Sequence, residues 1–455
     1  MNRVDDRALL ADDTIVAIAS PPGRGAIAVI RLSGPNAFSI ASRHVHNWHQ
    51  QPRVAHLSDF FDGEHRLDEV LVTAFPAPHS YTGEDTVEIS THGGYVVPST
   101  VVAALTGSGA RQATAGEFTR RAVLNGKLDL LQAEAIGDLI DASSRAMQDA
   151  ALSQLDGGLS RRLGALRNQL LELEALIAYD VDFPEEDDGP IPRDRIEKAI
   201  KAVSVSIDGL LSTVPAGEIV REGAIVVIAG PPNVGKSSLF NALLGKSRAI
   251  VTEIAGTTRD ALEAVIDSGN WPLRLVDTAG LRHTTDRIER LGIEVSERYL
   301  GAAEVVLACA ETAGDLDATV TLVRARTEAA IIPLLTKADL VSHRDQISPH
   351  ALSVSAESGS GLQRLLSQIE SVVDKECGPR THEVPLLTKA RHKHALELAR
   401  SEISDFYRVW SEDKLPATVA AVHLRTAITM LEELVGAVDV EDVLDRVFSS
   451  FCVGK

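Results

Sequence analysis

The sequence lacks several features that would assign it to a special class of protein. It has 3 cysteines in 455 residues, Cys309, Cys377 and Cys452, with no C-x-x-C pair and no zinc-ligand spacing. This argues against a disulfide framework and favours a reducing compartment. The longest apolar runs, such as AIVVIAG, are far shorter than a bilayer-spanning helix, and the start carries no apolar signal core. We therefore expect a cytoplasmic protein that has no membrane partner.

Positive charge is also scarce. The chain carries 45 Lys and Arg against 64 Asp and Glu, which gives a net charge of −19. Such a chain repels the phosphates of nucleic acid, so a role on RNA or DNA requires a basic partner. Aromatic residues make up only 4%, but 44% hydrophobic and 24% charged residues are typical of a globular protein. The length predicts about three domains.

The most informative segment is GAIVVIAGPPNVGKSSLFNALLG, which reads as a buried strand, a glycine loop and a helix. It contains G-x-x-x-x-G-K-S over residues 230–237. In such a loop, backbone N–H groups surround phosphate oxygens at a helix N-terminus, the lysine neutralises the β and γ oxygens, and the serine hydroxyl binds Mg²⁺. We expect Lys236 and Ser237 in these roles.

Four further motifs follow in the order typical of a GTPase. GTTRD offers Thr258 as a second Mg²⁺ ligand, and DTAG offers Asp277 near the metal and Gly280 near the γ-phosphate. Asp339 in TKAD can accept from both N1–H and N2–H₂ of guanine, which adenine cannot match. A loop at 355–357 would cover the base. The expected GTP-binding residues are Asn233, Val234, Gly235, Lys236, Ser237, Ser238, Thr252, Glu253, Ile254, Ala255, Gly256, Thr257, Thr258, Asp277, Thr278, Ala279, Gly280, Thr336, Lys337, Asp339, Ser355, Ala356 and Glu357.

Two positions depart from the usual GTPase pattern. The guanine motif usually begins with asparagine, and Thr336 lacks the amide that would donate to the base, at a cost of about 1 kcal/mol of binding. Specificity is expected to survive through Asp339. DTAG is followed by Leu281, which cannot orient the attacking water as the glutamine of Ras-like enzymes does. Hydrolysis is then either very slow or assisted by another group.

The sequence offers candidates for that assistance. The Asn233 carbonyl, with loop carbonyls at Thr252, Ile254 and Thr257, could hold K⁺ beside the phosphates, where the ion would neutralise developing charge. The alternative for Asn233 is ordinary loop hydrogen bonding. Glu289, beyond DTAGLR, could orient the water, and its alternative is a solvated acid.

Apolar residues at helical spacing flank the GTPase motifs on both sides. Such stripes occur over 128–142, 159–177, 396–410 and 424–434, and we interpret all four as core packing. Apolar faces on both sides of an inserted domain are most simply buried against each other. The stretch before them, residues 1–125, alternates strands, loops and helices and predicts an α+β domain.

These motifs together resemble one family. GPPNVGKSSLFNALL, VTEIAGTTRD, DTAGLR and the terminal FCVGK, with SYTGEDTVEISTHGG, GEFTRRAVLNGKLDLLQAEAIGDLI and AYDVDFPEED outside the GTPase, are similar to the bacterial tRNA modification GTPases of the MnmE (TrmE) family. The resemblance covers essentially the whole chain. It implies an N-terminal folate-binding and dimerisation domain at 1–125, a discontinuous helical domain at 126–216 and 379–455, and an inserted, doubly wound P-loop GTPase at 217–378.

The resemblance also implies an activity. A K⁺-dependent GTPase, acting as a homodimer with the FAD- and NADH-dependent partner MnmG in a heterotetramer, would add a (carboxymethyl)aminomethyl group to C5 of the wobble uridine, position 34, of certain tRNAs. The one-carbon unit would come from 5,10-methylene- or 5-formyl-tetrahydrofolate. By motif match, the folate contacts fall on Arg31, Glu88, Lys127 and Lys455.

The end of the chain, FSSFCVGK, gains a meaning from the resemblance. If Lys455 touches folate, the tail is docked and Cys452 lies near the one-carbon unit. Whether that thiol is a nucleophile or orients substrate stays open, because a thiol is reactive only when its pKa is lowered.

The alternatives are a GTPase switch in ribosome assembly or RNA binding, and a dynamin-like GTPase on membranes. The first usually carries a basic RNA-binding module and the second needs a lipid-binding segment, and neither is evident in the sequence.

Overall fold

The computed structural model of the chain describes residues 13–48, 51–182, 191–246, 248–249, 262–269, 271–277, 298–340, 351–377, 385–412, 417–436, 447–448, 451 and 454. The chain divides into two compact units, residues 1–137 with 432–455, and residues 138–431. This division differs from the domains expected from the sequence, which assigned the last residues to the helical domain.

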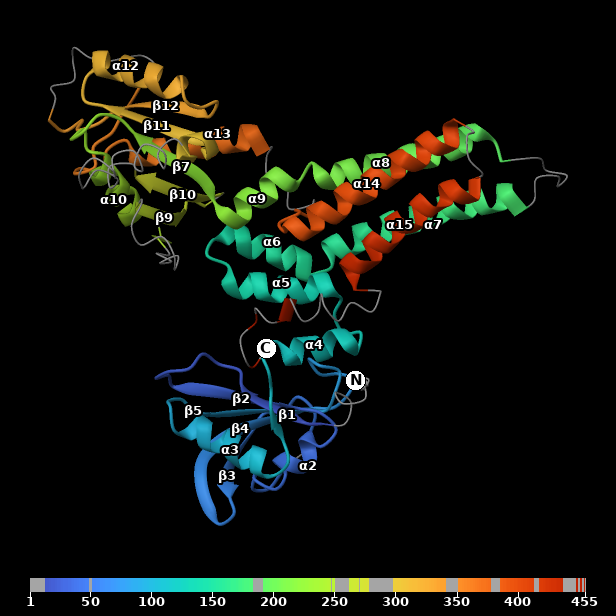
Figure 1. The fold of residues 1–455 in the computed structure, drawn as a ribbon. Coiled ribbons are helices and arrows are strands. Elements are labelled where there is room, and N and C mark those ends of the chain that lie inside the picture. The colour runs from blue at the N-terminus through green and yellow to red at the C-terminus, as the bar shows by residue number, and fades with distance from the viewer. Residues whose placement is uncertain are drawn as a thin grey trace, which may run out of the picture. The chain divides into compact units, whose positions relative to one another are not determined.

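The N-terminal unit is built on a six-stranded sheet in the order β3-β4-β5-β2-β1-β6 (Figure 1). Neighbouring strands are antiparallel except β1 and β6, which are parallel. Its strands are β1 Ile15–Ile18, β2 Ile27–Ser33, β3 His56–Asp62, β4 His65–Phe75, β5 Thr86–His92 and β6 Arg111–Gln112. Its helices are α2 Ala37–Ala41, α3 Val97–Gly107 and α4 Glu117–Leu124.

Side-chain alternation decides which face of this sheet is covered. On β4, Val70, Val72 and Ala74 are buried, whereas Leu71 between them is 44% exposed. Val70 and Val72 pack in one core with Val101 and Leu105 of α3. This alternation with a period of two is typical of a strand with one buried face, and α3 covers that face.

The last described residues pack within this N-terminal unit. Phe448 is 3% exposed and clusters with Leu130 and Ala133. Gly454 is buried and has a φ of 99°, and a Cβ there would lie 2.3 Å from the carbonyl oxygen of Ile18. Only glycine fits a backbone approach this close, so the chain end is seated beside β1.

The second unit contains long helices that pack along their apolar stripes. The helices of this region are α5 Leu130–Asp141, which extends into both units, α6 Arg145–Leu155, α7 Gly158–Asp182, α8 Arg193–Leu211, α9 Val214–Glu222, α14 Ala390–Ser411 and α15 Ala417–Val435. The predicted stripe of α7, from Leu159 to Ile177, is buried throughout. So is the α14 stripe from Leu396 to Trp410. Helix α8 packs on both α7 and α14 (Figure 1), which confirms core packing between segments far apart in sequence.

One described segment is long and apolar enough to cross a membrane by length and composition. It is Arg193–Glu222, covering α8 and α9, with a mean hydropathy of 1.3 in its most apolar window, half of which is buried in the structure. The expectation that all apolar segments are too short was therefore too strict. A helix in the core of a water-soluble protein passes the same test, so the segment is weak evidence for a span.

The second unit also contains a seven-stranded sheet in the order β13-β12-β11-β7-β10-β9-β8. Strands β13, β12, β11, β7 and β10 are parallel to one another. Strand β9 pairs antiparallel with β10 on one side and with β8 on the other. The strands are β7 Ala224–Ala229, β8 Arg248–Ala249, β9 Leu262–Asp267, β10 Pro272–Asp277, β11 Val305–Ala310, β12 Ala330–Leu335 and β13 Leu352–Ser353. The helices are α10 Lys236–Lys246, α12 Ala313–Arg324 and α13 Leu362–Cys377.

Both faces of this sheet are covered. Val226 and Ile228 of β7 pack in a core with residues of α10 and α13, whereas Val227 and Ala229 pack in a second core with Val323 of α12. A central parallel strand buried on both sides is typical of a doubly wound fold. The predicted fold class, an α+β domain with helices and a mostly parallel P-loop sheet, is confirmed.

The segments on either side of this sheet domain meet. The backbone N–H of Leu387 donates to Thr213 Oγ1 at 3.1 Å, across 174 residues. A Cβ on Gly217 would lie 2.0 Å from the Leu387 carbonyl oxygen, so the two chain segments cross in direct backbone contact.

The seat of the chain end generates a prediction. Gly454→Ala should loosen the tail, because the new Cβ clashes with the backbone at Ile18 and the left-handed φ costs about 1–3 kcal/mol for a non-glycine residue. Hydrogen exchange of peptides covering β1 and residues 447–455 should rise. Gly164→Ala, where a Cβ meets nothing within 4 Å, is the matched control and should leave exchange unchanged. Equal exchange in both variants would contradict the docked tail.

Candidate functional site: a phosphate loop, a buried aspartate and a base-binding turn

The loop between β7 and α10 has the geometry of a phosphate cradle. Gly230 has a φ of 151°, and a Cβ there would lie 2.3 Å from the Cys309 carbonyl oxygen at the neighbouring strand β11. Asn233 and Gly235 have φ values of 63° and 92°, in the left-handed region that Asn and Gly adopt most readily. The loop therefore turns sharply over the strand ends and feeds α10 with its N-terminus facing the turn.

Lys236 lies inside this loop. Its side chain is 7% exposed, and Nζ donates to the carbonyl oxygens of Gly230 at 3.0 Å and Pro231 at 2.7 Å. A buried ammonium held by neutral carbonyls has charge left to give to a phosphate, which is the role that the sequence predicts.

Ser237, in the first turn of α10, meets Asp277 at the end of β10. Ser237 Oγ donates to Asp277 Oδ2 at 2.6 Å, and Asp277 is fully buried at the end of β10. The parallel register pairs Asp277 with Ile228 of β7, which places the carboxylate directly beside the loop. A hydroxyl and a carboxylate are the oxygen donors that Mg²⁺ prefers, and Mg²⁺ takes few protein ligands beside phosphates and water. The pair thus fits a Mg²⁺ site, although no group of three or more His, Cys, Asp or Glu with metal-ligand geometry occurs in the described residues.

The predicted base-binding residues lie beyond β12. Ser355 Oγ donates to Asp339 Oδ1 at 2.5 Å and accepts from the backbone N–H of Ser358 at 3.1 Å. The hydrogen bond from Ser355 lowers the pKa of the Asp339 carboxyl, so Asp339 is an ionised acceptor at neutral pH. Ala356 and Glu357 form the turn that follows.

Thr336 and Lys337 contact the phosphate loop. Thr336 is 5% exposed, and its hydroxyl lies 2.6 Å from the Val234 carbonyl oxygen. The Lys337 side chain runs past Gly235, with Cε 3.9 Å from the position of a Cβ there, and Nζ pairs with Glu311 at 2.5 Å. Sequence reasoning treated Thr336 only as a missing base donor and did not find its contact with the loop.

The cysteine beneath the loop is not a reactive group. Cys309 is fully buried, and burial raises the pKa of its thiol to about 12. Lys236 opposes that shift without cancelling it. The thiol therefore stays protonated, and Cys309 serves to shape the floor below Gly230.

In the N-terminal unit, the predicted folate residues Arg31 and Glu88 face each other on neighbouring strands. Arg31 Nε and Nη2 donate to Glu88 Oε1 at 3.0 and 2.8 Å, with 17% and 31% of the side chains exposed. The Arg31 guanidinium lies 4.9 Å from the Tyr81 ring centroid and 5.7 Å from that of Phe118. Lys127 Nζ donates to the Pro78 carbonyl oxygen at 3.1 Å, so it contacts the same 78–84 loop that carries Tyr81.

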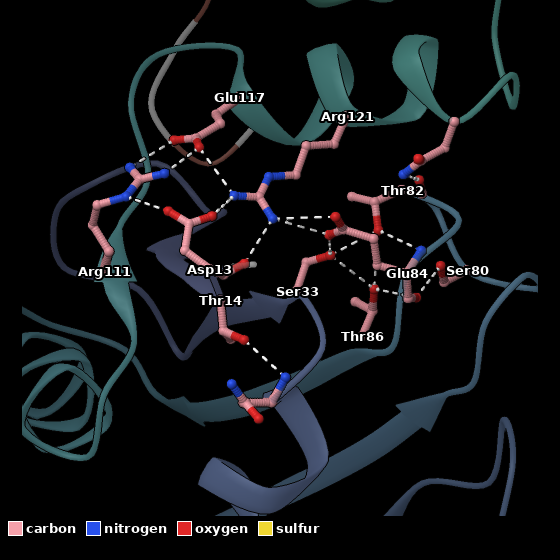
Figure 2. Close-up of polar contacts among 12 residues, drawn as sticks. Asp13, Thr14, Ser33, Ser80, Thr82, Glu84, Thr86, Arg111, Glu117 and Arg121 are labelled. Carbon is pink, nitrogen blue, oxygen red and sulfur yellow. Dashed lines mark hydrogen bonds and ion pairs between the residues drawn. The ribbon is translucent and has the colours of Figure 1, made fainter. Parts of the chain in front are cut away.

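That loop is fixed by an ionic cluster that sequence reasoning missed (Figure 2). Arg121 is 2% exposed and donates to Asp13 Oδ1 at 2.5 Å, Glu84 Oε1 at 3.2 Å and Glu117 Oε1 at 3.3 Å. Arg111 pairs with Glu117 at 2.5 Å and Asp13 at 2.7 Å. The three carboxylates surround the two guanidiniums and compensate the charge of Arg121, which would otherwise be costly to bury. The only sequence signal is a run of charges in the segment GEFTRRA.

Several predicted residues lie outside the described part of the chain, so their predictions stand untested. They are Thr252, Glu253, Ile254, Ala255, Gly256, Thr257, Thr258, Thr278, Ala279, Gly280, Glu289, Cys452 and Lys455.

Comparison with known proteins agrees with this geometry. Residues 14–127 match the family model described as "GTP-binding protein TrmE N-terminus", and residues 130–452 match "MnmE helical domain". The chain is 40% identical to the tRNA modification GTPase MnmE of Moorella thermoacetica over 98% of this chain and 100% of that protein. The chain belongs to the MnmE family.

Other relatives support this membership. The tRNA modification GTPase MnmE of Akkermansia muciniphila is 42% identical over 97% of this chain and 99% of that protein. Among solved structures, the G domain of the T. maritima FeoB iron transporter is 24% identical over 33% of this chain and 98% of that domain, with a TM-score of 0.26. The membership of this chain in the MnmE family rests on the full-length relatives.

The ionic cluster generates a prediction for the N-terminal unit. Arg121→Met should lower the free energy of local opening of β1 and β5 by about 3–5 kcal/mol, because Glu84 loses its buried ion partner and Glu117 keeps only Arg111. Native-state hydrogen exchange measures this opening. Arg66→Met is the control, since Arg66 is 53% exposed and pairs with Asp59 at the surface, where such a pair contributes about 0–1 kcal/mol.

The same experiment has a pH arm. Burial alone would raise the pKa of the Glu117 carboxyl, but hydrogen bonds from Arg111 and the Thr114 backbone lower it overall. A carboxyl with a lowered folded pKa stabilises the fold above its ordinary pKa, here 4.5, and this contribution is lost as the pH falls through the folded value. The difference in the free energy of local opening between wild type and Arg121→Met should therefore become smaller as the pH falls below the folded pKa of Glu117. A gap that is constant with pH would contradict a role for the carboxylates.

Proposed function

We propose that this chain is a GTP-hydrolysing enzyme of tRNA modification. It acts with a flavin-containing partner to add a (carboxymethyl)aminomethyl group to C5 of the wobble uridine of certain tRNAs, using a tetrahydrofolate one-carbon unit. The observation that carries the GTPase part is the 2.6 Å contact between Ser237 and Asp277 inside a glycine loop, with Asp339 and Ser355 beside the same sheet edge. The tRNA part rests on family membership.

The proposed division of labour at the nucleotide follows from the donor set. Lys236 and the N-terminus of α10 bind the β and γ oxygens, and Asp339 accepts from the guanine edge. Ser237, with Thr258, would hold Mg²⁺, and Asp277 would hold the hydroxyl and metal-bound water in place. The metal neutralises phosphate charge when bound.

K⁺ is proposed as the second cation, held by Asn233 with Thr252, Ile254 and Thr257. In support, Asn233 is exposed and takes a left-handed φ of 63° in the phosphate loop, so it is accessible to an ion from solvent. Glu289 is the proposed residue that orients water, because Leu281 after DTAG carries no polar group. These residues would assist hydrolysis without an arginine finger.

The folate is proposed to bind near Arg31, Glu88 and Lys127, with Lys455. An ion pair whose guanidinium lies over two aromatic rings suits a flat pterin ring with an anionic tail, because carboxylate and guanidinium both make bidentate contacts with planar groups. Gly454 seated against Ile18 supports a docked chain end, and Cys452 is proposed to act there on the one-carbon unit or on substrate orientation.

The proposed assembly is a cytoplasmic homodimer with the partner MnmG. The net charge of −19 supports a partner that contributes basic surface to the tRNA, because this chain alone repels phosphates.

The function is tested by nucleoside mass spectrometry of bulk tRNA from cells that lack the gene. Wild type should restore a C5-aminomethyl-type uridine, and Glu289→Ala should not, because hydrolysis would be lost. Cys452→Ser measures the contribution of the thiol. Arg66→Met, at a surface pair, is the control and should rescue fully. Unchanged tRNA in the deletion strain would refute the substrate.

The cation is tested on the purified chain. GTP hydrolysis should be about ten-fold or more faster in KCl than in NaCl at equal ionic strength. The reason is that the proposed site holds K⁺ in preference to the smaller Na⁺, and the bound ion neutralises the negative charge that develops in the transition state. Asn233→Ala should abolish the difference while GDP affinity persists. Equal rates in the two salts would refute the K⁺ site.

A further inference from the structure

Thr336 occupies the place where guanine-binding GTPases usually carry an asparagine, and its hydroxyl points to the protein backbone. Oγ1 lies 2.6 Å from the Val234 carbonyl oxygen and 3.1 Å from the Ala310 carbonyl oxygen. The residue is 5% exposed at the end of β12. Thr336 thus joins three segments: the phosphate loop, the end of β11 and the base-binding turn.

The single hydroxyl proton of Thr336 determines whether this residue can also donate to the base. A hydroxyl has one proton and otherwise only acceptor lone pairs. Both neighbours are carbonyl oxygens, which only accept, so the proton is committed to one of them, and Val234 is the closer. Guanine N7 is also only an acceptor, and therefore gains nothing from the oxygen of Thr336.

The other base-binding groups are set for the Watson–Crick edge. Asp339 is held by Ser355 at 2.5 Å and can accept from N1–H and N2–H₂ of guanine. Lys337, whose φ is 55°, lies along Gly235 and is tied to Glu311 at 2.5 Å. Thr336 and Lys337 therefore support the phosphate loop, while Asp339 reads the base.

We propose that Thr336 is a positioning residue for the phosphate loop and leaves guanine N7 without a donor. This inference rests on the proposed GTP-binding function and deepens it: the chain distinguishes guanine by N1 and N2 and tolerates the loss of the N7 acceptor. An asparagine amide in place of the hydroxyl carries two N–H protons and could donate to a carbonyl oxygen of the loop and to N7 together.

The test compares the dissociation constants of GDP, 7-deaza-GDP and IDP by titration calorimetry of the full chain with Mg²⁺. Wild type should bind GDP and 7-deaza-GDP equally, within about two-fold, because no hydrogen bond is lost at N7. IDP lacks the 2-amino group and should bind at least about five-fold more weakly, since one contact to a charged acceptor is lost.

Three variants separate positioning from base reading. Thr336→Val removes the hydroxyl at nearly constant shape and should weaken GDP and 7-deaza-GDP by the same factor, about five-fold. Thr336→Ser keeps the hydroxyl and should bind like wild type. Thr336→Asn should create a preference for GDP over 7-deaza-GDP of about five-fold. If Thr336→Val does not fold, the serine and asparagine variants still decide the matter.

The opposing outcomes are distinct. A wild-type preference for GDP over 7-deaza-GDP that Thr336→Val removes would overturn the proposal, because it would show that Thr336 reads N7. If Thr336→Asn, like wild type, binds GDP and 7-deaza-GDP equally, then residue 336 does not lie within reach of N7, and the geometry proposed for this position is wrong. Failure of wild type to bind any of the three nucleotides would instead refute the GTP-binding function itself.

Discussion

Parallel pairing of β7 with β10 and β11 sets the position of the phosphate-binding groups that the structure describes. The register places Asp277 beside Ile228 and Ala308 beside Ala229, so the ends of three strands reach the same edge of the sheet. The loop after β7 must then turn over the carbonyl oxygen of Cys309, which leaves no room for a side chain at Gly230. From this constraint follow the position of Lys236, the contact between Ser237 and Asp277, and the distance from Thr336 to Val234. A shift of one residue in β7 would move all of them, because side chains alternate between the two faces.

The N-terminal unit depends on a different kind of interaction. Its sheet packs a large apolar core with α3, and a smaller cluster around Ile15, Ala17 and Phe118 forms beside it. The 78–84 loop is fixed by charge: Arg121 holds Glu84 of the loop, Asp13 ahead of β1 and Glu117 of α4 together (Figure 2). Removing Arg121 would take the ion partner from Glu84, whereas Asp13 and Glu117 would keep Arg111. The position of the loop therefore depends on Arg121 in particular. The result is a firm frame around Tyr81 and the Arg31–Glu88 pair.

Sequence reasoning predicted some parts of this molecule well for identifiable physical reasons. The glycine loop and its lysine were predictable because phosphate binding needs specific residues at fixed spacing, and the α7 and α14 stripes because helical periodicity is a local property. The Arg121 cluster was not predictable, because it joins residues 13, 84, 111 and 117 that no local pattern connects. The partner of Thr336 was missed for the same reason: its hydroxyl bonds to a backbone atom about a hundred positions away, and a backbone atom leaves no mark in the sequence.

The crossing of Thr213 and Leu387 has a consequence for how this chain could have arisen. Because the segments before and after the P-loop sheet touch, the helices on both sides close on each other whatever lies between them, and the length of the intervening chain adds little to the entropic cost of closure. A domain attached at one such crossing can be acquired, exchanged or enlarged by recombination without repacking its host. The helical part of the molecule can in this sense accept different inserted domains, and the contact of Gly217 with the backbone of Leu387 marks the point of insertion.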